Sequence, residues 1–394
     1  MRTLLLFFAS SFLAAAATNT IPASGSVVSS TGFHHPGILV NRSQLDLVRS
    51  KVVAGLEPWK SAFEAAKAND LGSLIYTPHA WKTCECGPFS RPDLGCKDEQ
   101  RDSTAAYTQA LLWFITGNEA YARNATNIMN AWSSTLVGGH INANGPVQAA
   151  WCAEEFPRGA EIIRYTWPGW TSEDIGRFKA MLTLQYLPSL TNGSCENGNK
   201  ELSMSEAIIN IGVFNDDHAT FDLGVKMWRG RAPAYIYLAS DGPAPVTPAH
   251  CEAAIWGNKG LKTPLVDGLL QESVRDSGHA NMGLAAMVNA AETARQQGLD
   301  LYAEQEKRII AALEFQAKSL PPNNNPSPPN VSFHLHPTWE IAYNHYHHRK
   351  GRDLPFLQAV ILKNRPTGVN HHMAWETLTH AETGALGLPP LRNQ

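Results

Sequence analysis

An arginine and a histidine four residues apart are the clearest candidates for chemistry in this chain. Arg275 and His279 lie near the start of the segment QESVRDSGHANMGLAAMVNAAETARQQGLDLY, which covers residues 271–302. Residues four apart share one face of a helix, and Met282 and Ala286 continue nearly the same stripe. The spacing predicts that this pair faces the protein interior or a cleft. The pair would lie at the N-terminus of a helix whose other residues are mostly small and apolar.

Two further segments carry polar groups that could join this pair. In Asn197–Glu201 a glycine-containing turn enters an apolar helix, so that Asn199 and Lys200 would present donors at the helix mouth. An ordinary helix N-cap is the alternative for that segment. The run HLHPTWEIAYNHYHH, residues 334–348, is the densest cluster of His and Tyr.

In that His-rich run, a helix starting near Pro337 would place Trp339, Tyr343 and Tyr346 on one face. These aromatics could equally be core residues whose hydroxyls meet a polar partner. Asn215–His218 is a fourth polar group. Its acidic residues are predicted mainly to cap the next helix.

The elements that must position these residues are nearly all helical. Periodicity predicts helices over the following ranges: 43–53, 59–67, 103–116, 119–134, 147–165, 172–187, 202–213, 219–229, 281–297, 301–319 and 338–350. Gly117, Gly298 and Gly351 stand where helix ends are expected. About a dozen helices joined by short loops predict an all-α fold, a toroid of helical hairpins around a central cleft.

Two irregular stretches interrupt this pattern. Residues 230–270 include the one convincing strand, Ala234–Leu238, and a Pro/Gly-rich excursion that is too long for a simple connector. We expect this stretch to form a wall or lid over the helical scaffold. Residues 321–329, PPNNNPSPP, predict a surface loop.

The N-terminus has the pattern of a secretory signal peptide. Residues 1–17 combine one Arg, an apolar run and small residues, which leaves residues 18–394 as one mature, extracellular domain. No second apolar run is long enough to span a bilayer. N-glycosylation is expected, since four acceptor sequons are present, at Asn41, Asn124, Asn192 and Asn330.

The number of cysteines is consistent with an extracellular, oxidising compartment. All six (Cys84, Cys86, Cys96, Cys152, Cys195 and Cys251) lie in the mature part, and an even number predicts three disulfides. A zinc site made by the first three is the alternative, but their spacing matches no standard finger.

Composition limits the partners. The chain has 43% hydrophobic and 17% charged residues and a net charge of -3, so it lacks the basic field that nucleic acid requires. An anionic substrate would be held by a few local Arg, Lys or His residues. Its eleven Trp could serve as platforms for sugar rings, although core filling explains most of them. We expect a monomer without a cofactor.

Three of these stretches together resemble a known family. They are IGVFNDDHATFDLGVKMW, the 271–302 segment with its ESVRDSGH part, and WEIAYNHYHHRKG. In this order they are similar to the alginate-lyase-like superfamily of secreted proteins, and the likeness covers roughly residues 105–379. The resemblance implies an incomplete (α/α) toroid and a polysaccharide lyase that cuts a uronic-acid polymer, of alginate or glucuronan type, by β-elimination.

The reaction determines which residue types the site needs. A base removes the proton at C5, next to a carboxylate whose charge must first be neutralised, and an acid then protonates the departing O4. By resemblance, Arg275 matches the arginine of the family's ESxRD segment, and Asn199 with Lys200 falls where lyases have an Asn-His or Asn-Trp pair. Some lyases have a catalytic Tyr six or seven residues after that arginine, whereas this chain has Asn281 and Met282.

The resulting assignment combines helix phasing with these requirements. Arg275 and Asn199 would hold the uronate carboxylate, His279 or Tyr343 would act as base, and Tyr343 or Tyr346 would donate to O4. Further substrate contacts are expected from Lys200, His345, Trp151, Glu272 and Trp339.

Three alternatives stay open at this level. A glycoside hydrolase on the same toroid would need two carboxylates, and candidates are Glu154, Glu155, Glu161, Glu272, Asp276 and Glu340. A carbohydrate-binding protein without catalysis would explain the missing tyrosine. A metal site, which our assignment omits, could draw on His334, His336, His345, His347 and His348.

Overall fold

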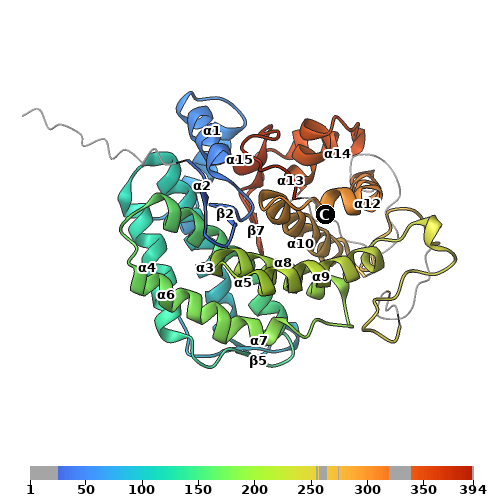
Figure 1. The fold of residues 1–394 in the computed structure, drawn as a ribbon, viewed down its shortest axis with the longest axis horizontal. Coiled ribbons are helices and arrows are strands. Elements are labelled where there is room, and N and C mark those ends of the chain that lie inside the picture. The colour runs from blue at the N-terminus through green and yellow to red at the C-terminus, as the bar shows by residue number, and fades with distance from the viewer. Residues whose placement is uncertain (1–24, 254–255, 257–263, 274, 319–338, 393–394) are drawn as a thin grey trace, which may run out of the picture.

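The long helices of the protein form two layers (Figure 1). The computed structural model describes residues 25–253, 256, 264–273, 275–318 and 339–392. The inner layer packs in chain order and is almost wholly buried; it consists of α3 (Cys96–Thr116), α5 (Gly145–Thr166), α8 (Gly198–Asn215) and α10 (Ser277–Gln296). Outside it lie α4 (Glu119–Thr135), α6 (Ser172–Met181) and α9 (His218–Tyr235).

The remaining helices close the ring. From α10 the contacts continue through α13 (Trp339–Tyr343) and α15 (Glu376–His380) to α1 (Arg42–Val53), and α1 packs on α3. Packed around this closure are α2 (Trp59–Ala68), α11 (Leu301–Glu304), α12 (Glu306–Lys318) and α14 (Pro355–Asn364). The predicted all-α toroid is therefore confirmed, and its closing contacts join elements from the two ends of the described chain.

Short elements complete the fold. The helical turns are η1 (Asp70–Gly72), η2 (Pro88–Ser90), η3 (Leu182–Tyr186), α7 (Leu187–Leu190), η4 (Ala239–Asp241) and η5 (Asn344–Arg349). Strands β1 (Val27–Val28) and β2 (His34–His35) pair, as do β6 (Val369–Asn370) and β7 (Met373–Ala374). The third sheet has the order β4-β3-β5, from β3 (Cys84–Cys86), β4 (Asp93–Leu94) and β5 (His140–Ile141).

Side-chain caps explain why several predicted helices start within a residue or two of where the pattern placed them. The Asn118 side chain accepts a hydrogen bond from the Ala120 N–H, and Asp217 caps α9 in the same way. Helix α10 begins earlier than its apolar pattern, because Asp276 accepts from the His279 N–H. Gly117 ends α3 with a φ of 71°, a left-handed conformation that favours glycine.

The strand predicted over Ala234–Leu238 is wrong. Helix α9 continues to Tyr235, and only an isolated bridge between Ile236 and Leu270 remains. The Tyr235 ring is buried beside Gly283 of α10, and its hydroxyl donates to the Ala280 carbonyl at 2.8 Å. Packing against α10 therefore overrides the β propensity of the Tyr-Ile-Tyr sequence.

Two of the three expected disulfides are present. Cys86 bonds to Cys96 and Cys195 bonds to Cys251, whereas Cys84 and Cys152 are free and buried. The prediction of a third disulfide is thus wrong. The zinc alternative for the first three cysteines also fails, because two of them are bonded to each other. Burial and the neighbouring Glu99 raise the pKa of both free thiols, which keeps them protonated.

The structure also constrains the features expected at the protein surface. The signal-peptide segment, Asn330 and the 321–329 loop lie outside the described residues. Asn192 is exposed, but Asn41 is buried and its amide donates to Gln296 at 2.9 Å, so the expectation of a surface glycan at Asn41 is wrong. None of the helices in the described ranges has the length and apolarity needed to cross a bilayer.

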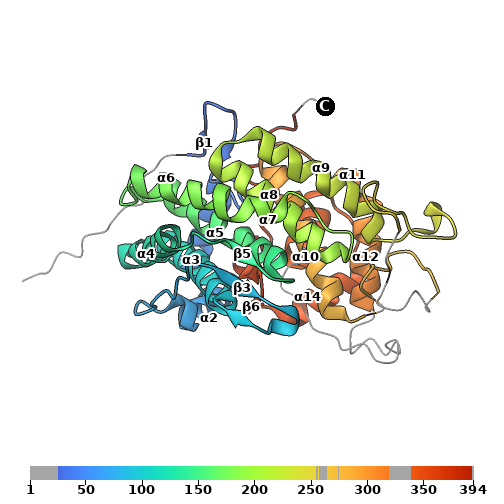
Figure 2. The ribbon, with the colours of Figure 1, turned by 90° about the horizontal axis from the view of Figure 1, so that it is seen from below.

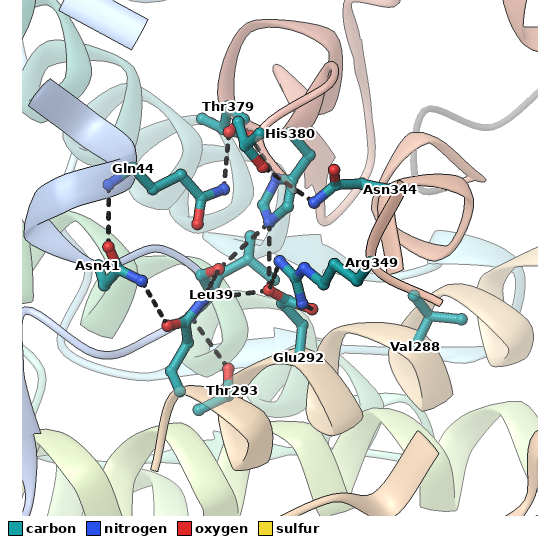
Figure 3. Close-up of polar contacts among 12 residues, drawn as sticks. Leu39, Asn41, Gln44, Val288, Glu292, Thr293, Asn344, Arg349, Thr379 and His380 are labelled. Carbon is teal, nitrogen blue, oxygen red and sulfur yellow. Dashed lines mark hydrogen bonds and ion pairs between the residues drawn. The ribbon is translucent and has the colours of Figure 1, made fainter. Parts of the chain in front are cut away.

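A buried ion pair joins α10 to η5 (Figure 3). Arg349 donates to both carboxylate oxygens of Glu292, at 2.9 and 2.7 Å. Burial opposes ionisation of Glu292, but Arg349 outweighs it and lowers the pKa of that carboxyl to about 2. His380 of α15 lies 3.9 Å from the same carboxylate and 3.2 Å from the Leu39 carbonyl. This network holds four separate parts of the chain together where the ring closes.

A second buried network sits beneath the β1–β2 hairpin and makes stability depend on pH. The ring nitrogens of His35 lie 2.9 Å from Glu161 and 3.0 Å from Asp216. Burial lowers the pKa of His35, but the two carboxylates outweigh it and raise the pKa to about 9 from an ordinary 6.5. The protonated His35 therefore contributes its full stabilisation of the folded state below pH 6.5. That contribution is lost as the ring loses its proton, when the pH rises through about 9.

We therefore expect the free energy of unfolding to fall by about 3 kcal/mol between pH 6.5 and 9.5 because of this histidine. Urea unfolding across that range measures it. His35→Gln should be less stable throughout but should lose this pH slope. An unchanged slope in the variant would assign the pH dependence to other groups.

Candidate active site

A cavity of about 480 Å³ opens where the starts of α8 and α10 meet α5. It brings together five of the residues that the sequence singled out, from three separate helices or their entry loops: Trp151, Asn199, Lys200, Arg275 and His279. The rest of the wall comes from the turn between β6 and β7 and from the loop between β3 and α3. The predicted convergence of α8 and α10 at one cleft is therefore present.

Arg275 supplies positive charge to this cavity. It lies just before α10, and its side chain is 29% exposed. Its nearest carboxylates are Glu272 at 3.5 Å and Asp276 at 3.7 Å. Both distances exceed those of a tight bidentate pair, so the guanidinium keeps donors for an anionic ligand.

His279 and Asp276 form a hydrogen-bonded dyad at the mouth of α10. His279 Nδ1 lies 2.7 Å from Asp276 Oδ2, and the same carboxylate caps the helix by accepting from the His279 N–H at 2.8 Å. Burial opposes ionisation of Asp276, but these hydrogen bonds and Arg275 lower its pKa to about 2.

An ionised carboxylate only accepts, so the proton of this contact sits on Nδ1. In the neutral imidazole, Nε2 then carries a free lone pair. The ring is 38% exposed and lines the cavity, which makes Nε2 a base available to a ligand.

Asn199 and Lys200 stand at the start of α8. Asn199 is buried at the cavity wall, and its side-chain oxygen accepts from the Lys200 N–H at 2.8 Å, which leaves the amide N–H₂ as a donor. Lys200 pairs with Glu196 at 2.6 Å, and its side chain is largely buried. The two residues add a neutral donor and a second cation to the lining of the cavity.

His371 is a cavity residue that the sequence analysis missed. It occupies the turn between β6 and β7 with a φ of 55°, and its ring lies 5.1 Å from that of Trp151. The only sequence signal was the pair His371-His372 between Val369-Asn370 and Met373-Ala374, which fits a two-residue hairpin.

The loop from Gly87 to Asp93 is also part of the wall and was also missed. The Cys86–Cys96 disulfide closes it, and Phe89 at its tip is 95% exposed with a φ of 53°. An exposed aromatic ring beside a polar cavity can stack on a sugar face. A Pro-Phe-Ser sequence between two disulfide-bonded cysteines would have been the signal for such a tip.

The positions where some lyases carry a tyrosine are apolar or buried here. Met282 packs with Trp151, Ala285 and Met373 in a small cluster beneath the cavity. Asn281 is buried. Neither residue lines the cavity in the described structure.

The aromatic residues expected from the His-rich helix do not reach this cavity. Tyr343 stacks on His347, Tyr346 donates to the Tyr302 carbonyl at 3.3 Å, and His345 stacks on Tyr302. Trp339 is buried in the same core. Helix α13 and η5 pack near Glu292, thirteen residues and therefore about 20 Å along α10 from His279. The placement of Tyr343, Tyr346, His345 and Trp339 at the cleft is corrected accordingly.

The acidic residues near the cavity are few. Among the described lining residues Asp93 is the one carboxylate, and it pairs with Lys97 at 3.1 Å. Glu272, expected to contact substrate, is buried beneath Arg275 and does not line the cavity. Glu154, Glu155, Glu161 and Glu340 are buried in the core. The described cavity therefore lacks the paired carboxylates of a glycoside hydrolase.

The metal alternative for the His-rich run finds no support in the described part of the chain. His345, His347 and His348 belong to no group of three ligand atoms close enough to share an ion. His334 and His336 lie outside the described residues.

Residues 230–270 were expected to form a wall or lid over the helical scaffold. None of the described residues between 236 and 270 lines the cavity. This segment instead protrudes from one side of the toroid, as Figures 1 and 2 both show. The Cys195–Cys251 disulfide ties it to the loop before α8. The prediction of a lid is wrong for these residues, because the segment packs beside α12 and not over α5.

Comparisons with known proteins identify the family and the fold of this chain. The family model described as alginate lyase matches residues 90–326, more than half of the chain. The comparison with curated proteins gives no match.

Solved structures show the same fold. Alginate lyase A1-III from Sphingomonas species A1 is similar, with 17% identity over 85% of this chain and 94% of that chain and a TM-score of 0.58. An alginate lyase from Bacteroides ovatus has 14% identity over 88% of this chain and 99% of that chain, with a TM-score of 0.58. A tyrosine-to-phenylalanine variant of A1-III, complexed with a tetrasaccharide, has 16% identity over 85% and 93% and a TM-score of 0.58.

Proposed function

Because the chain belongs to the alginate lyase family and is a polysaccharide lyase, we propose that it cleaves a uronic-acid polymer of alginate or glucuronan type by β-elimination. One observation carries the proposal: Arg275, Asn199 and His279, whose ring Asp276 holds, line one cavity that has no pair of carboxylates in its described wall. This set suits proton abstraction beside a neutralised carboxylate, and it does not suit hydrolysis.

The first step is neutralisation of the uronate carboxylate. Removing the C5 proton places negative charge on that carboxylate, and the cost falls when donors surround it. Arg275 supplies a guanidinium with free donors, and the Asn199 amide supplies a neutral N–H₂. Lys200 adds positive charge from the same helix mouth, although Glu196 holds its ammonium group.

The second step is proton transfer, and we assign it to His279. Its Nε2 takes the C5 proton, while Asp276 holds the ring and stabilises the imidazolium that forms. The electron pair left at C5 forms the C4–C5 double bond as the C4–O4 bond breaks. The imidazolium then returns its proton to O4, so that one side chain acts first as base and then as acid.

The stereochemistry of this shuttle predicts a preference among substrates. One imidazole can serve both C5 and O4 only when the C5 hydrogen and O4 lie on the same face of the sugar. Mannuronate and glucuronate meet that condition, and guluronate does not. We therefore expect faster cleavage of polymannuronate or glucuronan than of polyguluronate.

The test is to incubate the protein separately with polymannuronate, glucuronan, polyguluronate, pectate and glycosaminoglycans. We expect ultraviolet absorbance to rise with at least one of the first two, because β-elimination leaves an unsaturated uronide. New reducing ends without that absorbance would indicate a hydrolase. Saturable binding without any product would indicate a carbohydrate-binding protein and would contradict the proposal.

Secretion and N-glycosylation of the protein are part of the same proposal. We propose that residues 1–17 direct secretion and that residues 18–394 form one monomeric domain. The two disulfides support an oxidising compartment. Among the described sequons, Asn192 is the exposed one and is the proposed glycosylation site.

A further inference from the structure

A cluster of acidic residues lies in the core of the toroid, apart from the side chains assigned to catalysis. Glu154 and Glu155 project from α5, Glu206 from α8 and Glu376 from α15, and His372 follows His371 in the β6–β7 turn. Each of these side chains is at most 1% exposed. One cation, Arg158, is buried among the four carboxyl groups.

The contacts within this cluster leave several ligand atoms without a partner. His372 Nδ1 contacts Glu154 Oε2, and Arg158 donates to Glu206 Oε1 and, at 3.0 Å, to the His372 carbonyl. In the described structure, Glu154 Oε1, Glu206 Oε2 and His372 Nε2 have no hydrogen-bond partner. A fully buried polar atom without a partner is costly, and these three atoms belong to side chains that lie close together, which indicates a ligand that satisfies them.

The spacing of these groups suits a metal ion. Ligand atoms of Glu154, Glu206 and His372 all lie within 4.8 Å of one another. Atoms bound to a common ion at about 2.0–2.3 Å can be no further apart than about 4.6 Å, so small side-chain shifts would suffice. Arg158 is the cation buried among these carboxyl groups, and a divalent ion would stabilise the ionised form of the carboxylates that bind it.

We propose that Glu154, Glu206 and His372 bind a divalent transition-metal ion, Zn²⁺ or Mn²⁺, inside the toroid. Two carboxylates and one imidazole suit these ions, whereas Ca²⁺ takes six to eight oxygen ligands. The ion joins α5 and α8 to the β6–β7 turn. It therefore fixes the turn from which His371 reaches the cavity, and its role is structural and positional.

The first experiment measures metal in the native protein, with its disulfides intact. After dialysis against a chelating resin, elemental analysis should find about one Zn or Mn per chain, because a fully buried ion does not exchange. Unfolding in guanidinium with EDTA should release that ion. Refolding with Zn²⁺ or Mn²⁺ should then raise Tm by several degrees over refolding with Mg²⁺, Ca²⁺ or no metal.

Two ligand variants and one matched control locate the site. Glu206→Gln and Glu154→Gln keep side-chain size but remove an anionic ligand, and each should lose the bound ion and the metal-dependent rise in Tm. Glu376→Gln changes another buried carboxyl of the same cluster, whose Oε1 accepts from the Ala374 N–H at 3.0 Å, and it should keep both. Should one ligand variant fail to fold, the other variant and the refolding experiment still decide the question.

The alternative to a bound metal ion is that the carboxyl groups of the cluster are protonated. Burial raises the pKa of Glu206 and Glu376 to about 8, so protonated carboxyl groups could share hydrogens among themselves. Native protein with much less than one metal per chain, together with equal Tm values after refolding with and without metal, would overturn the proposal in favour of protons. Metal retained equally by all three variants would place the ion elsewhere. Neither readout uses lyase activity, so the result is independent of the substrate proposal.

Discussion

Replacing His279 by glutamine is expected to lower kcat on the cleaved uronan by about 100- to 10,000-fold. Glutamine keeps a polar side chain of similar reach at the mouth of α10, but it cannot accept and return a proton. Arg275 and Asn199, which we propose hold the carboxylate, remain in place, so KM should change far less than kcat. The initial rate of ultraviolet absorbance at saturating polymer measures the loss.

His218→Gln is the matched control for this variant. His218 also occupies the first turn of a helix capped by an aspartate, Asp217, but it lies outside the cavity and contacts the Thr31 carbonyl at 2.6 Å. This control should retain wild-type kcat. If His279→Gln kept full activity, the base would have to be another cavity group, and His371 would be tested next.

The largest expected effect on stability comes from Arg349→Leu. The substitution leaves the Glu292 carboxylate buried without the guanidinium that lowers its pKa to about 2. Breaking a buried pair by removing one partner costs about 3–5 kcal/mol, because the remaining charge is uncompensated. Urea unfolding monitored by circular dichroism should show that loss, or the variant should fail to accumulate as folded protein.

Arg352→Leu provides the comparison for that measurement. Arg352 lies three residues further on and pairs with Glu306 at 2.6 Å, but its side chain is 54% exposed. Water screens an exposed pair, so we expect no measurable change in stability. Equal stability losses in the two variants would show that the buried network of Figure 3 contributes no more than a surface ion pair.

The sequence predicted local structure and part of the site because both depend on neighbouring residues. The apolar period of α10 and its aspartate cap are local, and they placed Arg275 and His279 at one helix mouth. The glycine turn before α8 did the same for Asn199. The meeting of Arg275 and Asn199 at one cavity was implied by the resemblance to the alginate-lyase-like superfamily, and both residues line the cavity.

The sequence could not show which neighbour each helix face meets. Periodicity put Tyr343 and Tyr346 on one face of a helix, but the structure packs Tyr346 against Tyr302 and Tyr343 against His347, and α13 packs on α10, far from the cleft. His371 was not predicted because its position depends on a two-residue turn anchored by distant groups, including Arg158. Disulfide pairing likewise depends on distances that the linear order of the cysteines does not contain.

The closure of the ring has a consequence for how the protein is made. His380 of α15 meets the Leu39 carbonyl across 341 residues of chain, and α1 packs between α15 and α3. During synthesis the N-terminal helices leave the ribosome long before their partner in α15 exists. Contacts of such high sequence separation form slowly. The growing chain therefore exposes the face of α1 that α15 covers until α15 has been synthesised, and we expect aggregation to compete with folding during that interval.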